Sequence, residues 1–213
     1  MSRRNYTKET SFRHIPKHES SEKLIKLNVK DLKPTQMCIG LAQVENRKID
    51  FKNQAKERIV KHLINKPVPV VTNGKNEYWM LDRHHRLRAL LEVDNSAEAY
   101  GYVVKKIGNA ETSEILSFLN DQGWLYLYDN KGLGPYSPKE LPNNLLEMKD
   151  DPYRSLAWRL KQEGIFQPKP DIPYYEFRWS LWLRTRNFPP FNSRNLEPAL
   201  IAARKLVSSQ LGE

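Results

Sequence analysis

The chain has 213 residues and a net charge of +10, with 39% hydrophobic and 28% charged residues. This composition is typical of a globular protein with a substantial core and excludes a disordered or fibrous chain. A single cysteine, Cys38, excludes an internal disulfide framework and fits a reducing compartment. No apolar run approaches the roughly 18 residues that span a bilayer. We therefore expect a cytoplasmic protein with no membrane partner, whose basic charge favours nucleotides or nucleic acid.

The first half of the chain alternates predicted strands and helices after a polar, basic segment, residues 1–23, which predicts a flexible arm. Apolar residues recur at helical spacing from Phe51 to about Asn65 and predict one amphipathic helix, which Pro67 ends. After Asp82 the apolar period changes from that of a strand to that of a helix. Predicted strands occupy 24–29, 68–72, 77–81 and 99–106, with a hairpin-type turn at Asn73-Gly74.

The second half is predicted to be mostly helical. Asp151 as a cap, Pro152 in the first helical position and Gly164 after the last turn delimit a helix over about 152–163. The other predicted helices occupy 111–121, 173–186 and 195–211. We therefore predict an α+β (mixed α/β) fold. The arm at 1–23 precedes a phosphate-binding domain at 24–108, and a helical extension at 109–213 packs on that domain.

The junction between a strand ending at Asp82 and the helix that follows concentrates cationic side chains. The first turn of a helix has backbone N–H groups without partners, and the helix dipole adds positive charge there, so such a terminus attracts anions. Five cationic or potentially cationic residues fall within six positions and would repel one another without an anion: Arg83, His84, His85, Arg86 and Arg88. A phosphate is the simplest partner for them.

These residues also have structural interpretations. His84 shares the apolar stripe of the helix, so it is either a packed core histidine or a ligand contact, whereas His85 lies about 100° around the helix and favours a functional role. Arg86 could bind a phosphate bidentately, and Asp82 could act as the N-cap or as an ion-pair partner. Asp82, His84 and His85 could together hold a metal, but no HExxH or CxxC spacing supports zinc, so no metal site is predicted from a motif.

His85-Arg86-Leu87-Arg88-Ala89 resembles the ParB/sulfiredoxin superfamily, whose phosphate-binding turn ends in [H/R]-R-x-x-A at a strand–helix junction. Leu32-Lys33-Pro34-Thr35-Gln36 is similar to its early Pro-x-Gln element. Four segments in order resemble more closely the family described as Putative ParB-like nuclease: 32–36 with Ile39-Gly40, 82–85, 150–157, and 175–179 with Arg184.

The resemblance implies a ParB/sulfiredoxin-like domain that binds nucleotides, because ParB proteins hydrolyse CTP, sulfiredoxins use ATP and related free-serine kinases transfer a phosphoryl group. His85 and Arg86 match the phosphate-contacting pair, and Glu45 follows the Pro-x-Gln element as a candidate general base or metal-associated carboxylate. Two residues depart from the pattern. Arg83 replaces a glycine of the turn, and Cys38 does not match the sulfiredoxin cysteine, whose position falls at His84, so sulfiredoxin chemistry is not implied.

The leading hypothesis is an enzyme acting on phosphate esters or anhydrides: a nuclease, a nucleotide hydrolase or a small-molecule kinase. Catalysis is assigned to His85 with Glu45 or Asp82, and Mg²⁺ carried with ATP, ADP or CTP is a compatible cofactor. Phosphate contacts are assigned to Gln36, Arg83, His84, His85 and Arg86, with Lys48, Glu176 and Arg184 in support. The alternative is a non-catalytic, nucleotide-dependent DNA-binding or partition-type protein. The aromatic residues Tyr174 and Phe177 are predicted to belong to the core.

Overall fold

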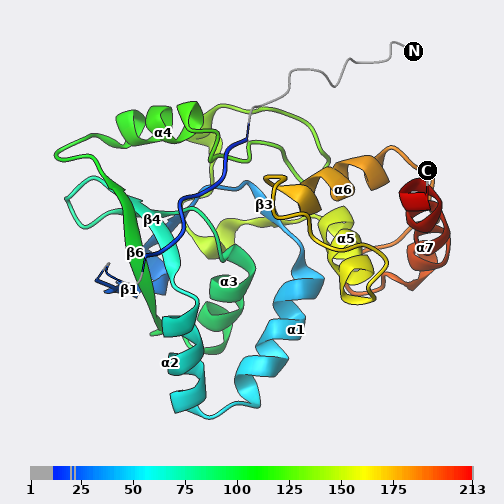
Figure 1. Cartoon of the computed structure of the whole chain (residues 1–213), viewed down its shortest axis with the longest axis horizontal. Coiled ribbons are helices and arrows are strands. Elements are labelled where there is room, and N and C mark those ends of the chain that lie inside the picture. Colours follow the sequence, from blue (N-terminus) through cyan, green and yellow to red (C-terminus); the bar gives the residue numbers. More distant parts are fainter. Residues whose placement is uncertain (1–11, 20, 22, 213) are drawn as a thin grey trace.

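The computed structural model describes residues 12–19, 21 and 23–212, and its centre is a five-stranded mixed sheet (Figure 1). The strands are β1 (Ile25–Asn28), β2 (Leu32–Pro34), β4 (Val68–Thr72), β5 (Tyr78–Met80) and β6 (Glu98–Lys106). Their order in the sheet is β1-β6-β4-β5-β2. The pairs β1/β6 and β4/β5 are antiparallel, whereas β4/β6 and β2/β5 are parallel.

Seven helices surround this sheet in the part of the chain that is described: α1 (Leu41–Lys52), α2 (Lys56–Asn65), α3 (His84–Val93), α4 (Thr112–Asp121), α5 (Pro152–Gln162), α6 (Tyr175–Arg184) and α7 (Glu197–Gly212). Short 3-10 turns lie at Val29–Asp31, Pro138–Glu140 and Leu145–Glu147. In Figure 1, α1, α2 and α3 lie below the sheet, α4 lies above it, and α5, α6 and α7 form a group at the right. The predicted mixed α/β fold is confirmed.

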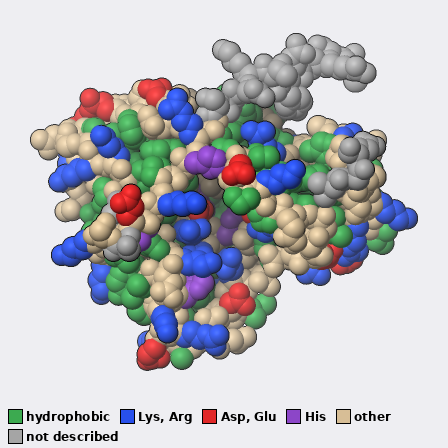
Figure 2. All heavy atoms as spheres, viewed as in Figure 1, with side chains coloured by type: hydrophobic (Ala, Val, Ile, Leu, Met, Phe, Trp, Pro, Cys, Tyr) green, Lys and Arg blue, Asp and Glu red, His purple; other side chains and the backbone are tan. Residues whose placement is uncertain are grey.

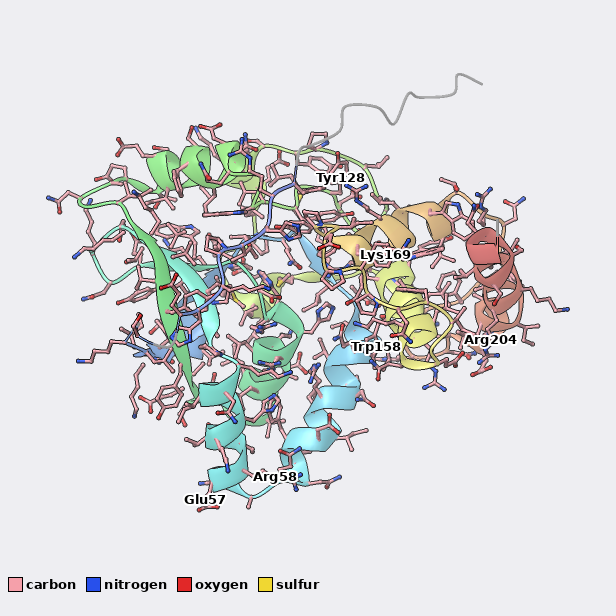
Figure 3. All side chains as sticks on the ribbon, viewed as in Figure 1. Glu57, Arg58, Tyr128, Trp158, Lys169 and Arg204 are labelled. Atoms are coloured by element: carbon pink, nitrogen blue, oxygen red, sulfur yellow. The ribbon has the colours of Figure 1, made fainter. Side chains whose placement is uncertain are left out.

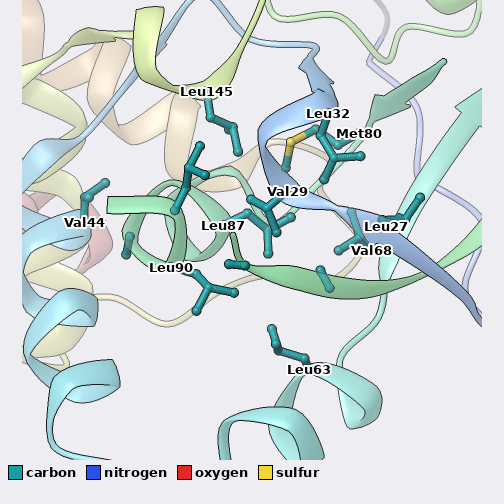
Figure 4. Packing of buried hydrophobic residues seen from close by; sticks show 14 of the residues in the cluster. Leu27, Val29, Leu32, Val44, Leu63, Val68, Met80, Leu87, Leu90 and Leu145 are labelled. Carbon is teal, nitrogen blue, oxygen red and sulfur yellow. The ribbon is translucent and has the colours of Figure 1, made fainter. Parts of the chain in front are cut away.

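Three clusters of buried apolar side chains hold these layers together. The first packs the sheet against α1, α2 and α3 through residues such as Leu87, Val68 and Leu63 (Figure 4). The second lies between the other side of the sheet and α4. The third joins α5, α6 and α7 around Leu160 and Leu183, so the helices of the second half have a core of their own.

A two-stranded parallel sheet joins the first half of the chain to the second. It pairs β3 (Cys38–Ile39) with β7 (Lys149–Asp150), which directly precedes α5. Gly40 follows β3 at a point where α1 and α5 meet, and a Cβ at this position would lie only 2.8 Å from the backbone nitrogen of Ser155. Glycine is needed here because any side chain would push the two elements apart.

The predicted helix over 51–65 is wrong in its extent. The structure has two helices, α1 and α2, separated at residues 53–55, where Ala55 is extended with φ −64° and ψ 147°. α1 begins ten residues before Phe51, at Leu41. Its buried apolar residues are Val44 and Phe51, while Gln43 and Arg47 face a cavity, so the sequence carries little of the apolar periodicity that reveals a helix.

The predicted arm is described only in part, since residues 1–11, 20 and 22 lie outside the described residues. Residues 12–19 run along the body of the protein. The hydroxyl of Tyr102 donates to the carbonyl of Pro16 at 2.8 Å, and the indole N–H of Trp124 donates to the carbonyl of His14 at 3.3 Å. None of the described helices is both long and apolar enough to cross a membrane.

Candidate functional site

The strand-to-helix junction at Asp82 opens into a cavity of about 460 Å³, bounded by α1, α3, α5, the segment 13–15 and the segment 168–177. Figure 2 shows this face hollowed near its centre, with Lys, Arg and His side chains around the hollow. Its cationic lining residues are Arg13, Arg47, Arg83, Arg86, Arg154, Lys161 and Lys169. The carboxylates in the lining are Asp82 and Glu176, and each is ion-paired, to Arg83 and Lys161 respectively. The cavity therefore carries a strong positive charge.

Each of the two junction histidines accepts a backbone N–H at Nε2, which leaves its Nδ1–H as a hydrogen-bond donor. His84 Nε2 accepts the backbone N–H of Thr35 at 3.2 Å, and His85 Nε2 accepts that of Gly40 at 3.2 Å. A neutral imidazole that accepts at Nε2 carries its proton on Nδ1. Burial, with the nearby Arg154 guanidinium, lowers the pKa of His84 to about 3 and that of His85 well below its usual range. Both rings are therefore neutral at pH 7.

Four buried donor groups on cavity-lining residues have no hydrogen-bond partner within the described structure. They are His84 Nδ1, Arg83 Nε, Arg86 Nε and the Tyr174 hydroxyl. Buried polar groups are nearly always paired, and an unpaired one costs on the order of 1–3 kcal/mol. His84 is only 2% exposed, so bulk water does not solvate its ring. Such donors identify the cavity as a site that an anion would complete.

Arg83 stands at a position of the turn whose backbone conformation favours glycine. Arg83 is the N-cap of α3 and has φ 75° and ψ 13°, a left-handed conformation that glycine adopts most easily. Its side chain pairs with Asp82 at 2.7 Å, and its N–H donates to the same carboxylate at 2.6 Å. Asp82 is thus the ion-pair partner of Arg83; its predicted alternative role as N-cap is wrong, because Arg83 occupies that position without a side-chain cap bond.

Replacing Arg83 should reveal the strain of this conformation. We expect Arg83→Gly to be more stable than Arg83→Ala by about 1 kcal/mol, since both lose the Asp82 ion pair but only glycine relieves the left-handed backbone. Urea unfolding of the two variants measures the difference. An alanine variant as stable as the glycine variant would show that the backbone at this position is relaxed.

Arg86 is buried, and its Nη1 donates to the carbonyl of Lys66 at 3.1 Å. Burial, together with the positive charges of Arg83 and Arg47, lowers the pKa of Arg86 to about 10. The direction of the shift follows from the cost of burying this charge beside other cations. An anion beside α3 would offset the repulsion that these three arginines exert on one another.

The structure brings most of the predicted site residues to the cavity, but not all of them. Gln36 lines it and accepts a bond from Arg154 at 3.0 Å, and Glu176 lines its far wall. Glu45 and Lys48 are absent from the lining: they pair with each other at 2.9 Å, and Lys48 also binds Glu92 at 2.8 Å, because α1 turns these positions toward solvent and α3.

Arg184 also lies away from the cavity. Its Nη2 donates to Asp151 at 2.6 Å at the start of α5, and its Nη1 donates to the carbonyl of Asn130 at 3.0 Å. The predicted core residues Tyr174 and Phe177 instead form part of the cavity wall. The cations that the sequence analysis did not assign to the site come from segments far from the junction: Arg13, Arg47, Arg154, Lys161 and Lys169. Of these, only Arg154 lies in a segment that carried the family resemblance.

The donor set suits an anion better than a resident metal ion. The described residues contain no group of three or more His, Cys, Asp or Glu side chains close enough to hold a metal. The cavity carboxylates Asp82 and Glu176 are already paired with cations. A divalent ion would therefore need oxygen ligands from a bound phosphate in addition to these side chains.

Comparisons with known proteins give the family and a solved structure of similar fold. The family described as "Putative ParB-like nuclease" matches residues 25–185, which include the junction and Arg154 but not Arg13. A solved structure, that of protein Atu1540 from Agrobacterium tumefaciens, superposes with a TM-score of 0.78 and 28% sequence identity, covering 91% of this chain and 95% of that one. No curated protein gives a significant match. Since the family matches most of the chain and the fold agrees, the chain belongs to the Putative ParB-like nuclease family.

Proposed function

We propose that the cavity binds a phosphate ester or anhydride the size of a nucleotide and hydrolyses it. The observation that carries this proposal is the set of buried, unpartnered donors on His84, Arg83, Arg86 and Tyr174. All four groups donate hydrogen bonds, so they suit a ligand that is rich in acceptor oxygens. A phosphate supplies such oxygens together with the negative charge that the arginines lack.

The dimensions of the site support the same ligand class. A cavity of about 460 Å³ falls in the range of small-molecule sites and holds a mononucleotide or the end of a nucleic-acid strand. The phosphate would lie at the first turn of α3, where the N–H groups of His84, His85 and Arg86 have no partner within the helix. Proline and aromatic residues of 168–177, including Tyr174, supply an apolar wall for the rest of the ligand.

The chemistry follows from charge stabilisation. Because His84 and His85 are neutral, they would donate Nδ1–H bonds to phosphate oxygens and stabilise charge as it develops, in place of the general-acid role predicted for His85. Water would attack phosphorus and lose its proton to Asp82 or Glu176, while the bond to the leaving oxygen breaks and that oxygen takes a proton from solvent. Mg²⁺ bound with the phosphates would add Lewis-acid stabilisation.

Substituting a cavity arginine tests the binding step. We expect ATP, ADP or CTP to raise the unfolding temperature of the wild type and Arg47→Ala to weaken Kd by about tenfold, the typical contribution of a charged hydrogen bond. The matched control is Arg58→Ala, since Arg58 is exposed near the start of α2. It lies far from Lys169, which lines the cavity (Figure 3). Equal affinities of the two variants would contradict this site, and a wild type that no phosphate ligand stabilises would refute the proposed function.

Turnover and salt dependence separate the two functional classes. Release of phosphate, nucleoside monophosphates or shortened single strands in the presence of Mg²⁺ or Mn²⁺ is the result expected of a hydrolase. Binding to duplex DNA that falls steeply with salt, without turnover, would instead support the partition-type alternative.

A further inference from the structure

Arg154 is a buried cation near Asp151, a carboxylate that is ion-paired with Arg184 instead. It lies in the first turn of α5, is 8% exposed, and donates from Nη1 to the Gln36 side chain at 3.0 Å and to the carbonyl of Cys38 at 2.9 Å. Its guanidinium stacks on the ring of Phe177 at 3.7 Å. Among the described residues no carboxylate forms an ion pair with it, although a buried charge is ordinarily paired.

Arg184 offers an internal comparison, because it shares two kinds of contact with Arg154 but differs in its counter-ion. It too stacks on an aromatic ring, that of Tyr153 at 4.4 Å, and donates to a backbone carbonyl. Its charge is neutralised by Asp151 at 2.6 Å. Arg184 does not line the cavity, whereas Arg154, which lacks the carboxylate, does. Arg154 thus lies at the cavity without a carboxylate ion-paired to it.

We propose that Arg154 binds the phosphate of the ligand from the α5 side, so that the helical half of the chain completes the anion site begun by α3. This inference rests on the proposed function and adds a ligand contact outside the 82–86 turn. The Gln36, Cys38 and Phe177 contacts hold the guanidinium plane in one orientation before the ligand arrives, so little side-chain entropy is lost on binding. Arg154 also acts electrostatically on both histidine rings and opposes their protonation, so it lies near the residues that begin α3.

The contacts of Arg154 also connect the helical half of the chain to the sheet half. The same Nη1 group that fixes Arg154 bonds to residues of the β2–β3 segment, which carries Thr35 and Gly40, the partners of the two histidines. A ligand held between α3 and α5 would therefore stabilise the junction of β3 with β7. The helical half is then part of the binding site and not only a cover for the sheet.

Matched arginine variants test the proposal, with inorganic phosphate and pyrophosphate as probes. We expect Arg154→Met to weaken the affinity for both by about 10- to 100-fold, in calorimetry at pH 7.5, and Arg154→Lys to recover part of it because the charge remains. Arg184→Met should lower stability yet leave both dissociation constants within about twofold of the wild type, since Arg184 pairs with Asp151 and does not line the cavity.

Each other outcome has a definite meaning. Wild-type affinity in Arg154→Met, or an equal loss in Arg184→Met, would overturn the role of Arg154 while leaving the proposed function in place. A wild type that binds neither probe nor any nucleotide would overturn both. Should Arg154→Met fail to fold, Phe177→Leu provides the readout: it keeps the charge but removes the stacking, so we expect about a fivefold loss of affinity, and no loss would count against the proposal.

Discussion

Replacing Asp151 with alanine should lower the free energy of unfolding by about 3–5 kcal/mol, the range for removing one partner of a buried ion pair. Asp151 is 2% exposed and accepts a bond from Arg184 at 2.6 Å, so its loss leaves a guanidinium without a counter-ion on a side chain that is only 16% exposed. The same carboxylate caps α5 by accepting the N–H of Tyr153 at 2.9 Å and that of Arg154 at 3.4 Å. Urea unfolding at pH 7.5 measures the effect.

Two further variants separate the ion pair from the cap. Asp151→Asn keeps an acceptor at the N-terminus of α5 but removes the charge, so it should lose less than the alanine variant. In the double variant Asp151→Ala/Arg184→Met neither charge remains buried, and its destabilisation should be smaller than the sum of the single effects. Strict additivity would show that the two side chains act independently. The result bears on function because α5 carries Arg154 into the cavity.

The second large effect is a loss of stability in mild acid. The folded state lowers the pKa of His84 to about 3, against about 6.5 in the unfolded chain, because burial and Arg154 disfavour the imidazolium. Between these values the unfolded state binds a proton that the folded state does not, so the stabilisation is complete above pH 6.5 and is lost as the pH falls toward 3. From pH 7.5 to pH 5 this one group should cost about 2 kcal/mol, and His85, shifted in the same direction, adds to it.

A non-titrating variant isolates the contribution of His84. His84→Gln retains an acceptor for the Thr35 N–H and cannot be protonated, so it should remove about 2 kcal/mol of the pH dependence measured by urea unfolding. His62→Gln is the comparison, since the ring of His62 is only half-buried and its pKa is lowered less by burial. If His84→Gln unfolds with the pH dependence of the wild type, His84 is not the group that opposes protonation in the fold.

The sequence by itself determined the features that depend on a few neighbouring residues. Asp151, Pro152 and Gly164 delimit α5 because caps and breakers act within one turn, and Gly164 has the positive φ of 74° that ends such a helix. The change of apolar period at Asp82 likewise located the start of α3 and the cluster of cations there. Family membership followed from segments in their order along the chain and is confirmed.

The tertiary structure alone decided which side chains share the cavity. Arg13, Arg47 and Arg154 come from segments separated by tens of residues. Arg47 and Arg154 meet at α3 because β3 pairs with β7 and α1 contacts both α3 and α5, and Arg13 is held there by the bonds of its segment to Tyr102 and Trp124. Spacing along the chain does not determine which side chains meet in the fold. Glu45 is near Gln36 in sequence, yet it lies on the face of α1 away from the cavity.

At Arg83 both the sequence and the tertiary structure contribute to the interpretation. The sequence shows an arginine where the turn is expected to have a glycine, but it does not show which backbone conformation the arginine adopts. The backbone keeps the left-handed conformation that glycine would adopt, with φ 75°, and the Asp82 ion pair holds the side chain in place. A turn of this kind is dictated by the strand and helix that it joins. Because β5 and α3 both pack in the first core cluster, the residue at the turn must accept the angle that they impose.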